Sequence, residues 1–197
     1  TERLEPALYL VPVPIGNRDD ITLRALKTLQ RVDIIASEDT RTTGQLLALY
    51  GITAQRLQPY HDYNEADRAS ALVQAVQQGS SVALVSEAGS PCISDPGYRI
   101  VQAAIEANVV IVPLPGATAL IPALSASGLA VHHFVFLGFP PQKKGREAFL
   151  QKALLHEETV VIYESAHRIV HLLEELSGLG AGQRRICIAR ELTKVYE

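Results

Sequence analysis

The sequence contains few cysteines and no excess of positive charge. Its 197 residues include two cysteines, 18 lysines and arginines, and 21 aspartates and glutamates, which gives a net charge of −3. Two thiols cannot form the disulfide framework of small secreted domains, so the chain suits a reducing compartment and we expect it in the cytoplasm. Because the overall charge is acidic, any nucleic-acid partner must be met by a local basic patch.

Charge is missing altogether from one long stretch. Residues 107–142 contain no Asp, Glu, Lys or Arg. Prolines, glycines and the His132-His133 pair divide this stretch into pieces shorter than the ~20 apolar residues of a membrane-spanning helix. We therefore expect core strand, loop and helix here, and no membrane partner.

The common phosphate-binding motifs are also absent. No Gly-x-Gly-x-x-Gly follows the first expected strand, and no Gly-x-x-x-x-Gly-Lys-Ser/Thr occurs anywhere. These absences argue against a dinucleotide cofactor and against nucleoside triphosphate hydrolysis. A nucleoside cofactor without a phosphate chain fits better, and S-adenosylmethionine is the commonest such molecule, although spacing alone does not name it.

A metal site has only weak support. His167 and His171 are four residues apart on an expected helix, a spacing that could hold zinc. No cysteine or carboxylate at matching spacing completes a ligand set, so we expect ordinary histidines on a helix face and no metal.

Residues 7–114 alternate short apolar runs with amphipathic stretches, a pattern typical of βαβ units and a mostly parallel sheet. It predicts strands at 7–13, 32–37, 55–57, 81–85 and 109–114, and helices at 22–30, 64–78 and 98–108. Asn64 is the expected N-cap of the second of these helices. We assign residues 1–116 to an N-terminal α/β domain.

A second α/β domain is expected over residues 132–197, after a connecting segment at 117–131 that carries a short helix of small residues. Its expected strands are 134–137, 159–163 and 186–189, and its expected helices are 146–156 and 167–176. Charge differs between the two parts, at 9 − 8 = +1 for residues 132–197 and 9 − 13 = −4 for residues 1–131. An anionic polymer would prefer the second domain.

The loops after the expected strands have an unusual composition. In open α/β sheets, ligands bind beyond the carboxyl ends of the strands. Here these positions are Val-Pro-Ile-Gly-Asn at 13–17, Glu-Asp-Thr-Arg at 38–41, Ser-Glu-Ala-Gly-Ser-Pro at 86–91 and Pro-Gly-Ala-Thr-Ala at 115–119. Three of the four combine small residues with proline and expose backbone groups, which suits the flat edges and ribose of a nucleoside.

Seven motifs in order carry a resemblance that covers essentially the whole chain. They are Val11–Asn17, Glu38–Arg41, Ser86–Gly97, Pro113–Gly116, Gly138–Pro141, Tyr163–Arg168 and Ala189–Lys194. Together they resemble the ribosomal RNA-modifying members of the tetrapyrrole-methylase-like, class III S-adenosylmethionine-dependent methyltransferases. The family typically has Asp and Thr where this chain has Glu87 and Ser90, so a carboxylate and a hydroxyl are retained.

The resemblance implies a fold, an activity and partners. The fold would be two α/β domains with the cofactor cleft between them, and the activity would be in-line methyl transfer from S-adenosyl-L-methionine to a cytidine ribose 2′-hydroxyl. The substrate would be 16S rRNA of the small ribosomal subunit, and the enzyme would be a homodimer. Because the family's chain continues beyond the last motif, we expect the second domain to be incomplete here.

Site residues follow from the same resemblance. The implied cofactor contacts are Pro14, Gly16, Ala88, Gly89, Ser90, Ile93, Thr118, Ala119, Tyr163, Glu164 and Leu192. The candidates for an RNA interface are Lys143, Lys144, Arg146 and Arg168. The catalytic residue is left open among Glu38, Asp39, Arg41, Glu87 and Lys194, because deprotonating a hydroxyl needs a positioned base and the sequence does not single one out.

Several alternatives stay open at this point. Residues 38–41 could be no more than an ion pair at a strand end, and residues 143–146 could be a solvated loop. The chain could also be a methylase of a small molecule such as a tetrapyrrole, which would share the cofactor loops. A third reading is a nucleoside-binding or RNA-binding module without turnover.

Overall fold

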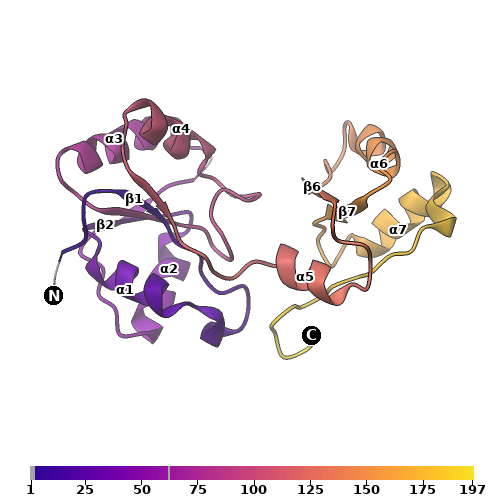
Figure 1. Ribbon diagram of the computed structural model, residues 1–197, viewed down its shortest axis with the longest axis horizontal. Helices are drawn as coiled ribbons and strands as arrows, with labels where there is room; N and C mark the ends of the chain where they lie inside the picture. The colour runs from indigo at the N-terminus through magenta and orange to yellow at the C-terminus, as the bar shows by residue number, and fades with distance from the viewer. Residues whose placement is uncertain (1–2, 62) are drawn as a thin grey trace. The chain divides into compact units, whose positions relative to one another are not determined.

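Five short parallel strands form the sheet of the first unit of the chain, Thr1–Thr118. Figure 1 shows this sheet with helices on both sides. The computed structural model describes residues 3–61 and 63–197. The strands are β1 (Leu8–Leu10), β2 (Ile34–Ser37), β3 (Leu57–Pro59), β4 (Val82–Val85) and β5 (Ile111–Pro113). They lie in the order β3-β2-β4-β1-β5, and all neighbouring pairs are parallel. Strands β2 and β4 are buried along their whole length, as strands covered on both faces must be.

Helices cover both faces of this sheet. α1 (Leu23–Arg31) and α2 (Thr40–Leu49) pack on one face, and α3 (Glu65–Gln77) and α4 (Tyr98–Glu106) pack on the other (Figure 1). Successive strand residues point to opposite faces, so Tyr9 and Ile35 join the core under α1 and α2, whereas Leu8 and Ile34 join the core under α3 and α4. The helices that follow β1 and β4 therefore lie on opposite faces.

Helix α2 corrects the expectation of a loop at residues 38–41. Asp39 is the N-cap of α2, and its carboxylate accepts the backbone N–H groups of Arg41 and Thr42 at 2.7 and 3.4 Å. This capping satisfies amides that a helix start leaves without partners, so the helix begins at Thr40. A further short turn that the sequence did not predict, the 3-10 helix η1 (Arg18–Asp20), follows β1.

The expected cap of α3 is also different. Asn64 occupies the N-cap position, but its side chain makes no capping bond to the helix. Instead its Oδ1 accepts the backbone N–H of His61 at 2.9 Å, which closes the turn before the helix. The helix N-terminus is therefore preceded by an Asn-stabilised turn.

The second unit, Ala119–Glu197, contains α5 (Leu120–Ala126), β6 (Phe134–Gly138), α6 (Arg146–Leu154), β7 (Thr159–Ile162), α7 (Ile169–Gly178) and the 3-10 helix η2 (Ala181–Gln183). Its sheet is the parallel pair β6-β7. The strand expected at 186–189 is wrong: this segment forms no strand, and Ile186 and Ile188 are 60% and 52% exposed. Within residues 3–61 and 63–197, no strand pairs with this segment, and the β6-β7 sheet of the same unit does not extend to it.

The other elements differ from the expectations mainly at their ends. The first strand is three residues long, because its parallel ladders end at Leu10; further along, Val13 makes only an isolated antiparallel bridge, to Gly89. The helix expected from His167 begins at Ile169, which leaves His167 outside it. Among the described residues, no helix combines the length and apolar character that crossing a bilayer requires.

Candidate functional site

The carboxyl ends of β1 and β4 define the candidate site of the first unit. These strands are neighbours in the sheet, with Leu10 opposite Leu84. The chain leaves β1 toward α1 on one face and leaves β4 toward α4 on the other (Figure 1). Open α/β sheets bind ligands where two adjacent strands part in this way. The topology therefore places the expected cofactor loops at the position that ligands favour in such sheets.

Backbone hydrogen bonds join the two loops directly. Val13 and Gly89 exchange a pair of them, with both N to O distances at 2.9 Å. Gly89 has a φ of +80°, a left-handed conformation that residues with side chains rarely adopt. A Cβ at this position would lie 3.3 Å from Cγ2 of Ile15. A glycine is therefore needed where the two loops meet.

A third loop joins the same cluster. The hydroxyl of Ser90 donates to the carbonyl oxygen of Ala117 at 3.1 Å, which connects the segment after β4 to the segment after β5. Ser86, at the end of β4, is buried, and its hydroxyl lies within hydrogen-bond distance of the Gly89 carbonyl. The structure thus brings together the neighbourhoods of Pro14, Gly89, Ser90 and Thr118, which the sequence placed in separate motifs.

The composition of this cluster fits a nucleoside-type cofactor. The loops 13–17, 86–91 and 115–118 present main chain and small side chains, and Glu87 is their single charged residue. Ala88, Gly16 and Ile93 are exposed at its surface, whereas Gly89 is buried. A wall of backbone groups with few charges suits an adenosine better than a pyrophosphate, which would need a glycine-rich nest or a helix N-terminus facing it.

Among the candidate catalytic residues, Asp39 is engaged in an ion pair. Its Oδ2 lies 3.2 Å from Nη2 of Arg41, and the side-chain hydrogen bond from Arg41, followed by its backbone N–H, holds the pKa of Asp39 below the usual value. The pair joins residues two positions apart at the start of α2. This is the alternative in which residues 38–41 form only an ion pair at a strand end. A carboxylate with a lowered pKa and several hydrogen-bond donors is a poor proton acceptor.

The other candidate bases occupy different settings. Glu38 and Glu87 follow the adjacent strands β2 and β4, whose last residues, Ser37 and Val85, pair in register. Glu87 is exposed and Glu38 is half-buried. Lys194 belongs to the second unit, where its Nζ lies 3.3 Å from Oε1 of Glu191.

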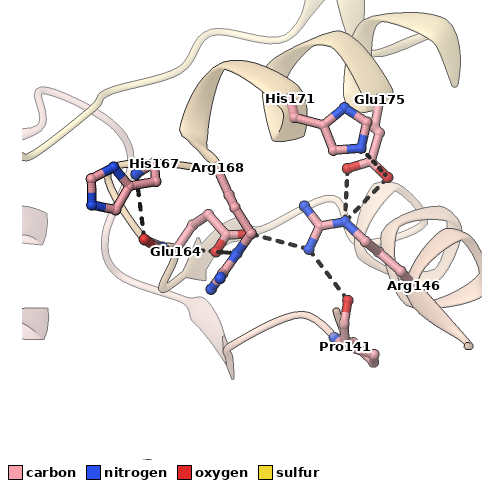
Figure 2. Close-up of polar contacts among 8 residues, drawn as sticks. Pro141, Arg146, Glu164, His167, Arg168, His171 and Glu175 are labelled. Atoms are coloured by element: carbon pink, nitrogen blue, oxygen red, sulfur yellow. Dashed lines mark hydrogen bonds and ion pairs between the residues drawn. The ribbon is translucent and has the colours of Figure 1, made fainter. Parts of the chain in front are cut away.

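A buried ionic cluster lies in the second unit at the carboxyl end of β7 (Figure 2). The side chain of Glu164 is 2% exposed, and its Oε1 accepts the Ser165 N–H at 2.7 Å and Nε of Arg168 at 2.8 Å. Its Oε2 lies 3.0 Å from Nη1 of Arg146. Burial alone would raise the pKa of Glu164, but the Ser165 amide and the two arginines together lower it.

Arg146 is the centre of this cluster, and this position corrects its expected role. Its side chain is 7% exposed, its Nε donates to Glu175 at 2.8 Å, and its Nη1 donates to the Pro141 carbonyl at 3.3 Å (Figure 2). An arginine buried between two carboxylates has no surface to offer an RNA phosphate. Arg146 therefore anchors α6 to α7 and to the end of β7.

The remaining candidates for RNA contact are accessible. Lys143 and Lys144 are exposed in the turn before α6, and the Arg168 side chain is 40% exposed. Gly145 separates the two lysines from Arg146, and its left-handed conformation (φ +85°) turns the chain between them. The basic run 143–146 therefore divides into two exposed cations and one buried anchor.

The other cofactor contacts expected in the second unit pack against neighbouring side chains or lie in turns. The Tyr163 ring makes edge contacts with Phe136 and Phe139, at centroid distances of 4.9 and 5.4 Å. Leu192 is half-buried in the turn before Lys194, and Ala119 begins the unit. His171 lies 3.6 Å from Glu175, and across residues 3–61 and 63–197 no group of three or more potential metal ligands is assembled.

Sequence reasoning missed the residues that follow β3. Tyr60 and Glu65 are both buried, and the Tyr60 hydroxyl donates to Glu65 at 3.0 Å. Glu65 also accepts backbone N–H groups at the start of α4. Burial raises the pKa of the nearby Cys92 thiol to about 11, which keeps it protonated and unreactive at neutral pH. These residues could have been found from the sequence by one signal: they follow a strand of the same sheet, as the other candidate loops do.

Comparison with known proteins places this geometry in a family. A family model described as Tetrapyrrole (Corrin/Porphyrin) Methylases matches residues 7–197. Among solved structures, the methyltransferase CobJ superposes with a TM-score of 0.64 at 22% identity, covering 88% of this chain and 76% of that one. A uroporphyrin-III C-methyltransferase from Thermus thermophilus in complex with S-adenyl homocysteine superposes with a TM-score of 0.58 at 20% identity, covering 88% and 77%. These likenesses define the fold as that of a tetrapyrrole methylase.

Curated relatives narrow the assignment. The chain is 49% identical over 191 residues to the ribosomal RNA small subunit methyltransferase I of Synechocystis, covering 96% of this chain and 68% of that protein. It is also 49% identical to the protein of the same name from Escherichia coli O157:H7, covering 96% and 66%. The chain therefore belongs to the tetrapyrrole methylase family and, within it, to the ribosomal RNA small subunit methyltransferase I group. It spans about two thirds of the length of these relatives.

Family membership confirms the expected fold class and the class of enzyme. The family consists of methylases, and the described fold is α/β with parallel sheets. The roles of the individual site residues stay predictions.

Proposed function

We propose that this chain is part of an enzyme that methylates the 2′-hydroxyl of a cytidine ribose in 16S rRNA of the small ribosomal subunit. The observation that carries the proposal is the backbone-lined junction at Val13 and Gly89, found in a chain 49% identical to relatives named for small-subunit rRNA methylation. The solved tetrapyrrole methylases are less than 25% identical to this chain and support the shared fold, not the substrate.

The loops of the first unit act mainly by alignment. S-adenosylmethionine supplies an electrophilic methyl group on a sulfonium centre. The backbone at residues 13–16 and 88–90 holds the adenosine part in place, and the hydrogen bonds through Val13 and Ser90 keep these loops in one arrangement. Holding two reacting groups in line contributes roughly 7–11 kcal/mol to lowering a barrier of this kind. A preformed wall at the strand ends supplies that alignment.

Proton removal from the ribose hydroxyl needs a base, and Glu87 is the best placed candidate in the first unit. It is exposed, it immediately precedes Ala88 and Gly89, and it follows the strand whose end defines the site. Asp39 has a lowered pKa and is paired with Arg41. A positioned base typically contributes about 10²–10⁴-fold to the rate.

Binding of RNA falls to exposed cations of the second unit. Lys143, Lys144 and Arg168 offer charged groups to the phosphate backbone, which supplies most of the affinity of nucleic-acid complexes. Arg168 presents its guanidinium from a fixed base, because its Nε is held by the buried Glu164. Such preorganisation suits a phosphate contact.

The resemblance further implies that the enzyme is a cytoplasmic homodimer. Exposed apolar residues of the second unit, among them Ile121 of α5, offer surface that a second copy could cover. Sedimentation velocity over a range of concentrations measures the association directly. A species of monomer mass at every concentration would contradict this part of the proposal.

The decisive experiment is methyl transfer from radiolabelled S-adenosylmethionine to purified small ribosomal subunits, with free 16S rRNA as a second substrate. Label in RNA at a cytidine resistant to alkaline cleavage on its 3′ side is the expected result, because a 2′-O-methyl group removes the attacking hydroxyl. Label in a tetrapyrrole and none in RNA would favour the small-molecule alternative. Tight binding of the cofactor without transfer to any substrate would favour a binding module.

A further inference from the structure

Glu65 is a buried carboxylate outside the cofactor, catalytic and RNA-contact sets described above. It is the first residue of α3, and its side chain is 11% exposed. Its Oε1 accepts the Tyr60 hydroxyl at 3.0 Å and the backbone N–H groups of Gly97 and Arg99 at 3.0 and 3.1 Å. With three donors on one oxygen, the carboxylate is held in a single position in the interior of the first unit.

The carboxylate serves as the missing cap of α4. The N-cap of that helix is Gly97, which has no side chain, and the first turn of α4 contains no acidic residue. Glu65 supplies the negative charge from α3, 32 residues earlier in the sequence than Gly97. A carboxylate at this position satisfies free amides and interacts favourably with the helix dipole. The start of α4 is therefore fixed by a side chain from another helix.

The start of α4 is also the end of the loop that carries the expected cofactor contacts Ser90 and Ile93. This loop, residues 86–97, turns through left-handed conformations at Cys92 (φ 71°) and Ser94 (φ 63°). Residues with side chains keep such conformations only where their surroundings hold them. A Cβ at Gly97 would lie 2.4 Å from Sγ of Cys92, so the turn packs directly against the helix start.

Two anchors thus hold the loop at its opposite ends. The Val13–Gly89 hydrogen bonds fix the segment after β4, and Glu65 fixes the segment before α4. Only the first anchor involves residues already expected at the site. The second acts from the opposite face of the sheet, where α3 and α4 pack.

We propose that Glu65 is a positioning residue for the methyl-donor site: by holding Gly97 and Arg99, it keeps residues 90–94 in the conformation that binds S-adenosylmethionine. This inference rests on the proposed function, since it takes the loop to be a cofactor loop. Glu65 acts through the backbone and does not itself touch the cofactor.

The test measures the Kd of S-adenosylmethionine and of S-adenosylhomocysteine by calorimetry for the full chain, together with the unfolding temperature. Glu65→Ala removes the carboxylate, and Glu65→Asp keeps the charge but shortens the side chain by one carbon. Glu65→Gln keeps an oxygen at the same reach. Ser81→Ala is the matched control, because the buried Ser81 hydroxyl donates to Asp33 at 2.8 Å at the amino end of β4, the end opposite to the one that carries the loop.

We expect Glu65→Ala and Glu65→Asp to raise the Kd roughly 10-fold to 100-fold, the range known for residues that support the ligands of metal sites. Glu65→Gln should restore most of the affinity. Ser81→Ala should lower the unfolding temperature and leave the Kd unchanged. The Kd is read well below the unfolding temperature of each variant, which separates lost positioning from lost stability.

Other results would overturn the inference. If Glu65→Asp binds the cofactor as tightly as the wild type, the carboxylate position does not matter to the site. If Ser81→Ala weakens binding as much as Glu65→Asp does, the effect reflects general destabilisation. Should Glu65→Ala not fold, the Asp and Gln variants decide between these outcomes. If the wild-type chain itself binds neither compound, the proposed function fails before the role of Glu65 is reached.

Discussion

Val13 and Gly89 exchange two backbone hydrogen bonds across the ends of neighbouring parallel strands. Parallel strands do not form such a reciprocal antiparallel pair within their own ladder, so the bridge requires the chain after β4 to turn back toward the chain after β1. Gly89 makes this turn possible through its positive φ. The junction therefore depends on a glycine, which the sequence shows, and on its pairing with Val13, which the sequence does not show.

Replacement of Gly89 should damage the site more than removal of the neighbouring hydroxyl. Gly89→Val forces a β-branched residue into a conformation with φ +80° and places its Cβ 3.3 Å from Ile15. We expect a stability loss of about 1–3 kcal/mol from the backbone strain. We also expect S-adenosylmethionine binding at least tenfold weaker, measured by calorimetry.

Ser90→Ala is the control for that substitution. It removes the hydrogen bond to the Ala117 carbonyl, worth about 0.5–1.5 kcal/mol, and leaves the backbone path unchanged. Binding of the cofactor should stay within about threefold of the wild-type value, since a threefold change corresponds to less than 1 kcal/mol. Equal losses of affinity in the two variants would contradict a site built mainly from backbone.

Loss of Arg146 should destabilise the second unit strongly. Arg146→Ala leaves the buried carboxylate of Glu164 without one of its two arginines and removes the arginine partner of Glu175. Breaking a buried ion pair from one side typically costs about 3–5 kcal/mol. Lys144→Ala, two residues earlier and exposed, should change the free energy of unfolding by less than about 0.5 kcal/mol. Urea denaturation followed by circular dichroism measures both.

A double-mutant cycle separates the ion pair from the cost of burying it. Arg146→Met with Glu164→Gln replaces both partners by uncharged side chains of similar size. This variant should be more stable than Arg146→Met alone, because Glu164, whose side chain is 2% exposed, is then no longer a buried charge without Arg146, whereas Glu175 loses Arg146 in both variants. Additive losses in the double variant would show that the two side chains do not interact energetically.

The second unit should lose stability in acid through Glu164. Its folded-state pKa lies below the ordinary value of 4.5, so the native state favours the ionised form. The stabilisation is present above the unfolded pKa and is lost as the pH falls through the lower, folded pKa. We expect the wild type to lose more stability between neutral pH and acid, below about pH 4.5, than Glu164→Gln does. If the free energy of unfolding falls equally with pH in the two proteins, the loss of stability in acid comes from another carboxyl group.

The expected sheet of the first unit was predictable because four of its five strands are apolar runs between amphipathic segments, whereas β3 is Leu-Gln-Pro and lies two residues later than the expected strand at 55–57. Helix α2 was missed because Thr40, Thr42 and Gly44 weaken its helical pattern, and because Asp39 reads as part of a loop until its capping bonds are seen. The strand expected at 186–189 failed for the opposite reason. Its alternation is strand-like, but alternation alone does not make a strand, and the segment pairs with neither β6 nor β7.

The candidate site was predictable only where neighbours in sequence are neighbours in space. The loops after β1 and β4 could be selected because ligands favour strand ends. Glu65 could not be selected, because its partners at Gly97 and Arg99 are 32 and 34 residues away. Arg146 was grouped with Lys143 and Lys144 by adjacency, and only the turn at Gly145 shows that it points into the interior.

RNA affinity should depend on the two exposed lysines before α6. Lys143→Ala combined with Lys144→Ala removes two cations, so the slope of log K against log salt should become shallower by about 1.4 for single-stranded RNA. Lys152→Ala, a single exposed cation within α6, is the charge control and should leave the slope nearly unchanged. Filter binding to a 16S rRNA fragment at several salt concentrations measures the slope. An unchanged slope in the double variant would favour a solvated loop.

The role of Glu87 as the base is tested by measuring kcat and the Kd of S-adenosylmethionine in the same variant. Glu87→Gln keeps the size and hydrogen-bonding reach of the side chain but cannot accept a proton, so kcat should fall about 10²–10⁴-fold. The Kd of S-adenosylmethionine should stay unchanged, because the loop backbone at Gly89 is intact. Glu38→Gln, which changes the carboxylate after the neighbouring strand β2, serves as the comparison. If Glu38→Gln alone abolishes turnover, the base follows β2, and if neither variant does, proton removal belongs to a residue of the second unit such as Lys194.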